Sequence, residues 1–140
     1  MSDLYERDFY AWSNEQAALL RAGDLAAADI AHIAEEIESM GRSEKRELVS
    51  RLTVLLLHRL KWRFQPERRS RSWELSIDNA RDALSEHLAD NLSLKAKLPE
   101  AVAVAYRTAR RETAIETGIA LETFPAACPW SFAQAMQDAP

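Results

Sequence analysis

Apolar residues recur along this chain at the three- and four-residue steps of an α-helix, and no segment alternates as a half-buried strand would. Glycine, proline and capping residues divide the pattern into segments. We expect helices over residues 8–22, 24–41, 43–65, 70–90 and 99–117, and a short one after Ser131. The predicted fold class is therefore all-α: a helical bundle of about five main helices with a short C-terminal helix.

The segment 24–41 carries a regular apolar stripe, which predicts one buried helix face. Its members follow one another at steps of three, four and three residues: Ile30, Ile33, Ile37 and Met40. Asp24 is a suitable N-cap residue for this helix, and Gly41 is a natural residue to end it.

The segment 43–65 is predicted to be the central helix of the bundle, because the run from Val54 to Leu57 is apolar all round the helix. We expect Leu55 or Leu56 to be almost inaccessible to solvent, and each buried leucine to contribute about 1.5–3 kcal/mol. The expected four-helix core is formed by the segments 24–41, 43–65, 70–90 and 99–117.

The last part of the chain, residues 119–140, is predicted to be an irregular extension that ends in the short helix. Pro125 and Pro129 lie close together and exclude a helix between them. Because the chain has a length typical of one domain, we expect residues 1–140 to form a single helical domain.

The charges are sorted by segment. Residues 1–41 have a balance of −7, residues 42–71 of +7 and residues 72–140 of −4, within a total of −4. A pI near 5.4 argues against general nucleic-acid binding, although it leaves room for a local basic patch.

Composition places the chain among ordinary globular proteins, with 47% hydrophobic and 29% charged residues. The single cysteine excludes an intramolecular disulfide and favours a reducing compartment. The N-terminal stretch MSDLYERDFY is acidic, and no apolar run approaches the ~20 residues of a membrane span. We therefore expect a cytoplasmic protein without membrane contact.

The basic segment from Arg59 to Trp73 is the first candidate for function. It has six basic residues and one acidic residue, with three aromatic residues interleaved. These cations have three interpretations: they neutralise the acidic residues Glu35, Glu36 and Glu38, they bind an acidic protein, or they hold a nucleic-acid backbone.

Pro66 ends the preceding helix, so Arg68 and Arg69 are expected to point outward. Arg59 or Arg63, inside the helix, is expected to be paired and partly buried. The candidate binding residues are Arg63, Arg68, Arg69, Arg71 and Trp73.

The second candidate is a metal site formed by His32, Glu36 and His58, because helical bundles build such sites from facing helices. The di-iron pattern Glu-x-x-His is absent, and His58 is better explained as a core histidine bonded to a carboxylate or a backbone carbonyl. His87 is expected to face solvent. We expect no cofactor.

Catalysis has weaker support. A reactive cysteine needs a lowered pKa, and Cys128 is followed by Pro129 with no histidine near it in sequence. A packed, inert thiol is the preferred interpretation. No nucleophile motif or glycine-rich phosphate loop is present, so no catalytic residue is assigned.

Several longer strings resemble one bacterial family, the domain of unknown function 29 family. They are DFYAW at 8–12, EEIESMGRSEKREL at 35–48, VLLLHRLKW at 54–62, QPERRSRSW at 65–73, and ETGIALETFP at 116–125 with the following CPW. The resemblance spans nearly the whole chain. It implies a small, all-α cytoplasmic protein, and it implies no activity or functional residue.

Together these features favour a non-enzymatic protein-interaction module whose basic segment Arg59–Trp73 meets an acidic partner. The alternative is a metal-dependent enzyme or metal-binding bundle that uses His58, Glu36 and His32. A further alternative is a weak nucleic-acid binder. The oligomeric state stays open.

Overall fold

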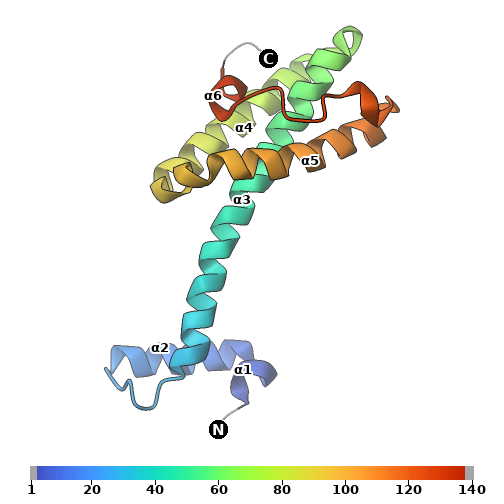
Figure 1. Cartoon of the computed structure of the whole chain (residues 1–140). Coiled ribbons are helices and arrows are strands. Elements are labelled where there is room, and N and C mark those ends of the chain that lie inside the picture. The colour runs from blue at the N-terminus through green and yellow to red at the C-terminus, as the bar shows by residue number, and fades with distance from the viewer. Residues whose placement is uncertain (1–2, 138–140) are drawn as a thin grey trace. The chain divides into compact units, whose positions relative to one another are not determined.

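The computed structural model describes residues 3–137, and this part of the chain contains helices and connecting turns but no strand (Figure 1). The all-α bundle predicted from the sequence is confirmed. The elements are α1 (Leu4–Arg7), α2 (Phe9–Arg21), α3 (Ile30–Phe64), η1 (Pro66–Arg68), α4 (Arg71–Asp90), η2 (Leu92–Lys97), α5 (Leu98–Thr117), η3 (Leu121–Thr123) and α6 (Phe132–Ala135).

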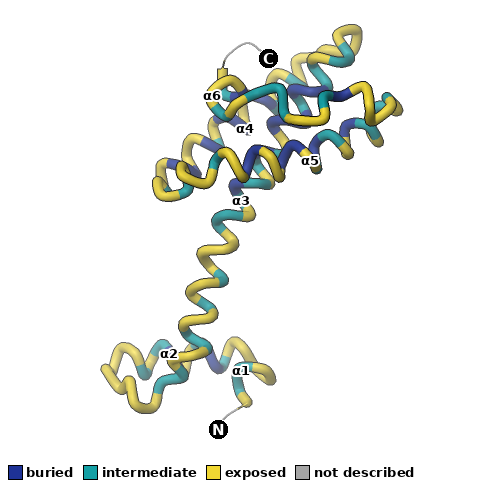
Figure 2. The backbone as a smooth tube through the Cα atoms, viewed as in Figure 1, coloured by how far each residue is buried: buried dark blue, intermediate teal, exposed yellow. Residues whose placement is uncertain are grey.

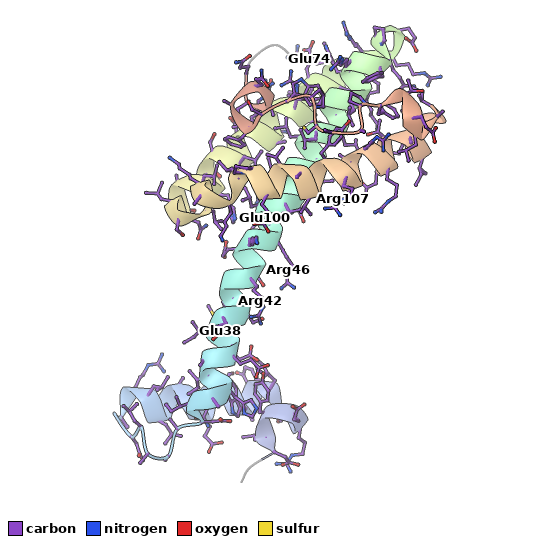
Figure 3. The ribbon with its side chains drawn as sticks, in the orientation of Figure 1. Glu38, Arg42, Arg46, Glu74, Glu100 and Arg107 are labelled. Carbon is purple, nitrogen blue, oxygen red and sulfur yellow. The ribbon has the colours of Figure 1, made fainter. Side chains whose placement is uncertain are left out.

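The predicted break at Gly41 is wrong, because α3 continues through it as one helix. Glycine within a helix costs about 1 kcal/mol relative to alanine but does not forbid the conformation, and Gly41 does not have the positive φ of an ending glycine. An ion pair between Arg42 and Glu38 spans this region, with 3.9 Å between Nη1 and Oε2 (Figure 3). Such pairs one turn apart support a helix.

The predicted helix start at Asp24 is also wrong. The Asp24 carboxylate accepts a hydrogen bond from the backbone N–H of Ala27 at 3.2 Å, but the residues that follow form turns. The helix begins at Ile30, where the Asp29 side chain accepts from the His32 N–H at 3.4 Å. Aspartate favours turns and helix N-caps for the same reason, so the sequence alone does not separate the two.

The chain divides into two compact units, residues 1–43 and residues 44–140, and α3 contributes residues to both. The first unit holds α1, α2 and the beginning of α3. It has a small aromatic cluster in which the Tyr5 ring stacks on His32 at 4.0 Å and meets Trp12 edge-on at 4.8 Å. Only Trp12 and Gln16 are buried among its described residues.

The predicted apolar stripe of this region is mostly exposed rather than buried. Ile30, Ile37 and Met40 are 52%, 63% and 68% exposed. No residue of α3 before Leu48 is buried, so the expected contribution of the segment 24–41 to a four-helix core is also wrong (Figure 2). Periodicity identified the helix, but it does not say which neighbour covers the apolar face.

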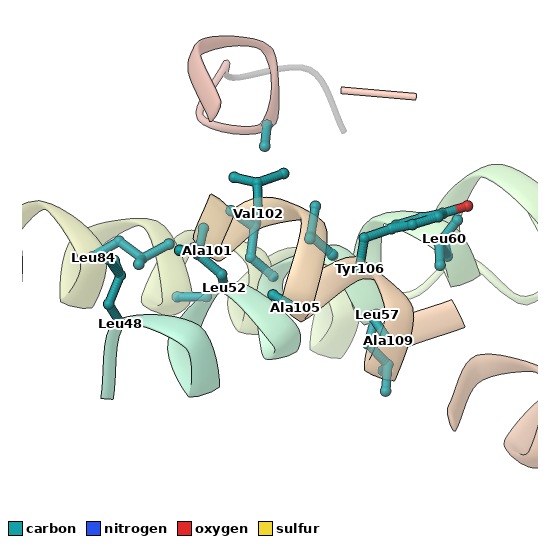
Figure 4. Packing of buried hydrophobic residues seen from close by; sticks show 14 of the residues in the cluster. Leu48, Leu52, Leu57, Leu60, Leu84, Ala101, Val102, Ala105, Tyr106 and Ala109 are labelled. Atoms are coloured by element: carbon teal, nitrogen blue, oxygen red, sulfur yellow. The ribbon is translucent and has the colours of Figure 1, made fainter. Parts of the chain in front are cut away.

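The second unit has the extensive core, formed by α3 from Leu48 onward, α4, α5 and the C-terminal segment. Both Leu55 and Leu56 are fully buried, as predicted. On α5 the inward residues Ala101, Ala105 and Ala109 recur at steps of four, and their small side chains let the helix pack closely against the leucines of α3 (Figure 4).

The predicted end residues of the later helices are confirmed. The Ser70 side chain accepts from the N–H of Trp73 at the start of α4, and Gly118 ends α5 with a φ of 73°. Ser131 and Gln134 form a complete capping box on α6.

After α5 the chain turns back across the second unit to α6 (Figure 1). Phe124 anchors this segment: it is 1% exposed and its ring lies 4.9 Å from that of Phe64. The buried guanidinium groups of Arg59 and Arg81 donate to the carbonyls of Gln134 and Ala135, at 2.6 and 3.2 Å. These carbonyls lie at the end of α6, where a helix leaves its last carbonyls without an intrahelical donor; that of Gln134 also accepts from the Gln137 N–H at 3.2 Å.

Candidate functional site

The basic turn lies in the second unit, at the connection between α3 and α4. Arg63, Arg68 and Arg71 are exposed, and none of these side chains makes an ion pair or hydrogen bond with a residue between positions 3 and 137. Arg69 is exposed as well, but its Nε donates to the Trp62 carbonyl at 2.8 Å and its guanidinium covers the Trp62 ring at 5.0 Å. The outward orientation predicted for Arg68 and Arg69 is confirmed.

The expectation for Arg59 and Arg63 is confirmed in part. Arg59 is buried, its Nη1 donates to the Gln134 carbonyl at 2.6 Å, and its guanidinium lies 4.6 Å from the centre of the Trp130 ring. Burial first, and then the nearby charge of Arg81, lower the pKa of Arg59. Arg63 is exposed instead of paired.

The aromatic residues of the turn are occupied by contacts within the second unit. Trp62 lies under Arg69, and Phe64 packs edge-on against Phe124. Trp73 is half-buried with the Lys61 ammonium 5.8 Å from its ring, and Lys61 forms an ion pair with Glu116. Each of these rings therefore already has a neighbour within the unit, and none is fully exposed for a stacked nucleic-acid base.

The second unit has a further surface feature, an apolar groove of about 760 Å³ between α5 and the C-terminal segment. Its walls include Val102 and Tyr106 of α5 and Trp130 and Phe132 of the segment. The groove exists because the segment crosses α5 and is held there by the Tyr106 hydroxyl, which donates to the Pro125 carbonyl at 2.5 Å.

Three arginines of α5 line this groove. Arg110 donates to the Phe124 carbonyl at 3.2 and 3.3 Å and so helps to hold the wall. Arg107, labelled in Figure 3, and Arg111 lie one helical turn apart and are exposed. Neither forms an ion pair or a side-chain hydrogen bond with any of the residues from 3 to 137.

Electrostatics link the groove to the basic turn. Burial is the main reason that the pKa of Tyr106 is raised, and the cations Arg110 and Arg63 act in the opposite direction. The positive charge that lines the groove itself comes from α5, where Arg107 and Arg111 are exposed.

Cys128 also lines the groove, and it has the properties of an inert thiol. Its Sγ donates to the Trp130 carbonyl at 3.2 Å. Burial raises the pKa of the thiol above its usual value, although the Trp130 hydrogen bond and Arg59 oppose this effect. A raised pKa leaves less thiolate at neutral pH, which makes a nucleophile less reactive.

The candidate metal ligands His32 and Glu36 lie in the first unit, where both contact Tyr5. The His32 Nδ1 lies 2.7 Å from Asp29 Oδ2, and this bond raises the pKa of His32 while it lowers that of Asp29. The Tyr5 hydroxyl donates to Glu36, and that bond is the main reason that the pKa of Tyr5 rises to about 12.

His58 belongs to the second unit, where its Nδ1 donates to the Val54 carbonyl at 2.8 Å. The bond to a backbone carbonyl is as expected from the sequence, but His58 is only partly buried, so the expected place in the core is wrong. His87 is 7% exposed, so the expectation that it faces solvent is wrong. Among residues 3–137 the only three metal-ligating side chains that come together are Glu44, Glu47 and His87.

Comparison with known proteins decides the family. The sequence pattern described as domain of unknown function DUF29 matches residues 4–139. The chain belongs to the DUF29 family. No curated protein and no solved structure matches it.

The structure tests only one part of the expectation that the protein has no membrane contact. None of the described helices of this DUF29 chain is long and apolar enough to cross a bilayer.

Sequence reasoning missed Arg107 and Arg111 as members of a cationic surface. Their spacing of four on α5, beside the inward stripe, was the available signal. Nothing in the sequence predicts the groove, because the groove depends on where the C-terminal segment crosses α5.

Proposed function

We propose that this DUF29 chain is a non-enzymatic protein-interaction module that binds an acidic segment of a partner protein. The observation that carries the proposal is a pair of exposed cations, Arg107 and Arg111, that line an apolar groove. Five exposed arginines of the second unit make neither an ion pair nor a side-chain hydrogen bond with a described residue: Arg63, Arg68, Arg71, Arg107 and Arg111.

Charge complementarity determines the chemistry of the partner. Arginine forks onto carboxylates with two hydrogen bonds, and exposed arginines without an internal partner are free to do so. The groove of about 760 Å³ falls within the 300–1,000 Å³ typical of ligand sites, so it has room for apolar side chains. The partner segment is therefore acidic and carries apolar anchor residues.

Nucleic acid fits this surface less well than an acidic peptide. The aromatic rings of the turn are covered or packed, and the chain has a net charge of −4, which repels a polyanion outside the local patch. The experiment must therefore distinguish binding of nucleic acid from binding of an acidic peptide.

The test measures fluorescence anisotropy of labelled peptides on the full chain. The probes are an acidic peptide with leucine and tryptophan anchors, the same peptide with serine in place of the anchors, and a single-stranded oligonucleotide. The anchored acidic peptide should bind most tightly, and its affinity should fall as salt rises from low to physiological concentration.

The deciding variant is Arg107→Ser with Arg111→Ser. Loss of two charge-assisted contacts should weaken the anchored acidic peptide by about 10-fold or more. The matched control removes the same charge from exposed lysines of η2, Lys95→Ser with Lys97→Ser, and should change the affinity by less than about 2-fold. If both double variants weaken the peptide equally, the effect comes from the net charge of the chain alone, and the proposed site is wrong.

A second double variant, Arg68→Ser with Arg71→Ser, tests whether the basic turn belongs to the same surface. It should weaken the acidic peptide as well. An oligonucleotide that binds more tightly than every peptide would overturn the proposal in favour of a nucleic-acid binder.

A further inference from the structure

The second unit contains a polar cavity of about 340 Å³ between α3 and α4, distinct from the apolar groove. Glu44 and Glu47 of α3 line it one turn apart, and His87 of α4 faces them. One potential ligand atom of each residue lies within 4.8 Å of the others. The cavity therefore gathers an imidazole and two carboxylates from two helices.

The hydrogen bonding of His87 determines which ring nitrogen is available. Its Nε2 lies 2.8 Å from the Glu44 backbone carbonyl, and a carbonyl only accepts, so the proton is on Nε2. The other nitrogen, Nδ1, then carries a lone pair and has no hydrogen-bond partner. Its nearest polar group is Glu47 Oε2 at 3.7 Å.

This arrangement of His87 is the one that metal-binding histidines adopt. They donate one ring N–H to a carbonyl or carboxylate, which sets the tautomer and aims the other nitrogen at the metal. The His87 side chain is 7% exposed, and it lines the polar cavity.

Glu47 is oriented in the same way by a neighbour. Arg51 donates to its Oε1 from Nε at 3.1 Å and from Nη2 at 2.5 Å. Both bonds use one oxygen, so Oε2 remains on the side of His87. The carboxylate of Glu44 is 46% exposed, and its Oε2 lies 3.7 Å from the His87 ring. It is thus free to complete a set of three ligands.

We propose that Glu44, Glu47 and His87 bind one divalent first-row transition-metal ion, with Zn²⁺ as the best match. Donors about 2.0–2.2 Å from a tetrahedral Zn²⁺ lie about 3.4 Å apart, close to the 3.7 Å between Glu47 and the His87 ring. An imidazole ligand favours Zn²⁺, Ni²⁺ or Co²⁺ over Mg²⁺ or Ca²⁺, which prefer oxygen alone. Three protein ligands leave a fourth position for water.

The proposal is independent of the acidic partner, since none of the three ligands belongs to the cationic surface. The ion would join α3 to α4. Glu86 and Asp90 also line the cavity and would add to its negative potential.

The experiment is isothermal titration of the full chain with ZnCl₂, followed by elemental analysis after dialysis. One Zn²⁺ per chain is expected, and MgCl₂ should give no comparable binding. Zinc should also raise the thermal midpoint, because an ion that binds only the folded state stabilises it.

Variants identify the ligands. His87→Ala should weaken zinc by more than about 100-fold, since loss of an outer-shell partner alone costs 10–100-fold. Because His87 is buried and its loss can unfold the chain, Glu44→Gln and Glu47→Gln provide a second test that preserves volume. Each should weaken zinc in a chain whose circular dichroism is unchanged.

The matched controls are His58→Ala, a histidine of the same unit bonded to a carbonyl, and Glu86→Gln, a cavity residue outside the ligand set. Both should bind zinc as the unaltered chain does. Absence of zinc binding by the unaltered chain overturns the proposal. So does zinc binding that survives both glutamine variants or is lost equally in the controls.

Discussion

The two units of this chain are stabilised in different ways, although both are helical. The second unit buries a continuous apolar cluster that runs from Leu48 to Ala135. The first unit has only Trp12 and Gln16 buried among its described residues, and polar contacts hold it around Asp29. The Asp29 carboxylate accepts from Trp12 Nε1 at 3.1 Å and contacts His32, and the Asp29 N–H donates to Gln16 at 2.7 Å.

The difference shows how helical structure persists with little core. Burial of apolar surface is the dominant favourable term in folding, and the second unit has most of it. The first unit relies on an aromatic cluster and on directed hydrogen bonds, whose net contribution is smaller per contact. We therefore expect the first unit to open locally before the second unfolds.

The largest effect should come from the core of the second unit. Leu56→Ala removes a fully buried side chain and should lower the free energy of unfolding by about 2–5 kcal/mol. Urea denaturation followed by circular dichroism measures it. Val54→Ala, in the same apolar run but 46% exposed, is the control and should cost much less. Equal urea denaturation midpoints for the two variants would show that this helix does not belong to the core.

In the first unit, Gln16→Ala should cost about 1–3 kcal/mol, because it leaves the backbone N–H of Asp29 without its acceptor. The effect should be local. Hydrogen exchange should accelerate in α2, and the amides of the core segment from Leu48 to Leu60 should exchange at their former rates. Exposed Glu15, replaced by alanine, is the control. Acceleration in both units would contradict the separation.

The stability of the first unit should depend on pH through the bond between His32 and Asp29. The pKa of His32 is raised above its ordinary 6.5, so its stabilising contribution is complete below pH 6.5 and is lost as pH rises through the folded-state pKa. The pKa of Asp29 is lowered below its ordinary 3.8, so its contribution is complete above pH 3.8 and is lost as pH falls through the folded-state value.

The His32–Asp29 pair therefore stabilises the first unit most between pH 3.8 and pH 6.5. NMR titration of the His32 ring measures its pKa, and hydrogen-exchange rates in α2 measure the stability of the unit. Charged or titratable neighbours that face the pair are Glu6 and Glu35, and Tyr5 is stacked on the ring. The substitution Asp29→Asn should return the pKa of His32 toward 6.5. An unchanged titration in that variant would show that the Asp29 bond does not control it.

The smallest effect is expected at the basic turn. Arg68→Ser and Arg71→Ser remove exposed side chains without an internal partner, so each should change the free energy of unfolding by no more than about 0.5 kcal/mol. Chemical denaturation checks this. A loss above 1 kcal/mol would show that these arginines stabilise the fold and are not free for a partner.

Sequence reasoning was most successful where the determinants are local. The ends of α4, α5 and α6 depend on a few neighbouring residues, and the predicted ranges 70–90 and 99–117 and the helix after Ser131 agree with the structure to within one residue. It failed at Gly41, where a weak helix-ending preference competed with a continuous helix and lost. For the candidate sites it identified the exposed Arg68 and Arg69, but it placed His87 in solvent and overlooked Arg107.

The amino-acid sequence by itself determined the helical class, most helix ends of the second unit and the leucines of its core, because side-chain periodicity and capping act over a few residues. Only the tertiary structure decided which apolar stripes are covered, where the C-terminal segment creates a groove on α5, and that His87 meets Glu44 and Glu47. These outcomes depend on contacts between residues far apart in the chain. Helical spacing places side chains on a face, and only the packing of elements determines what that face meets.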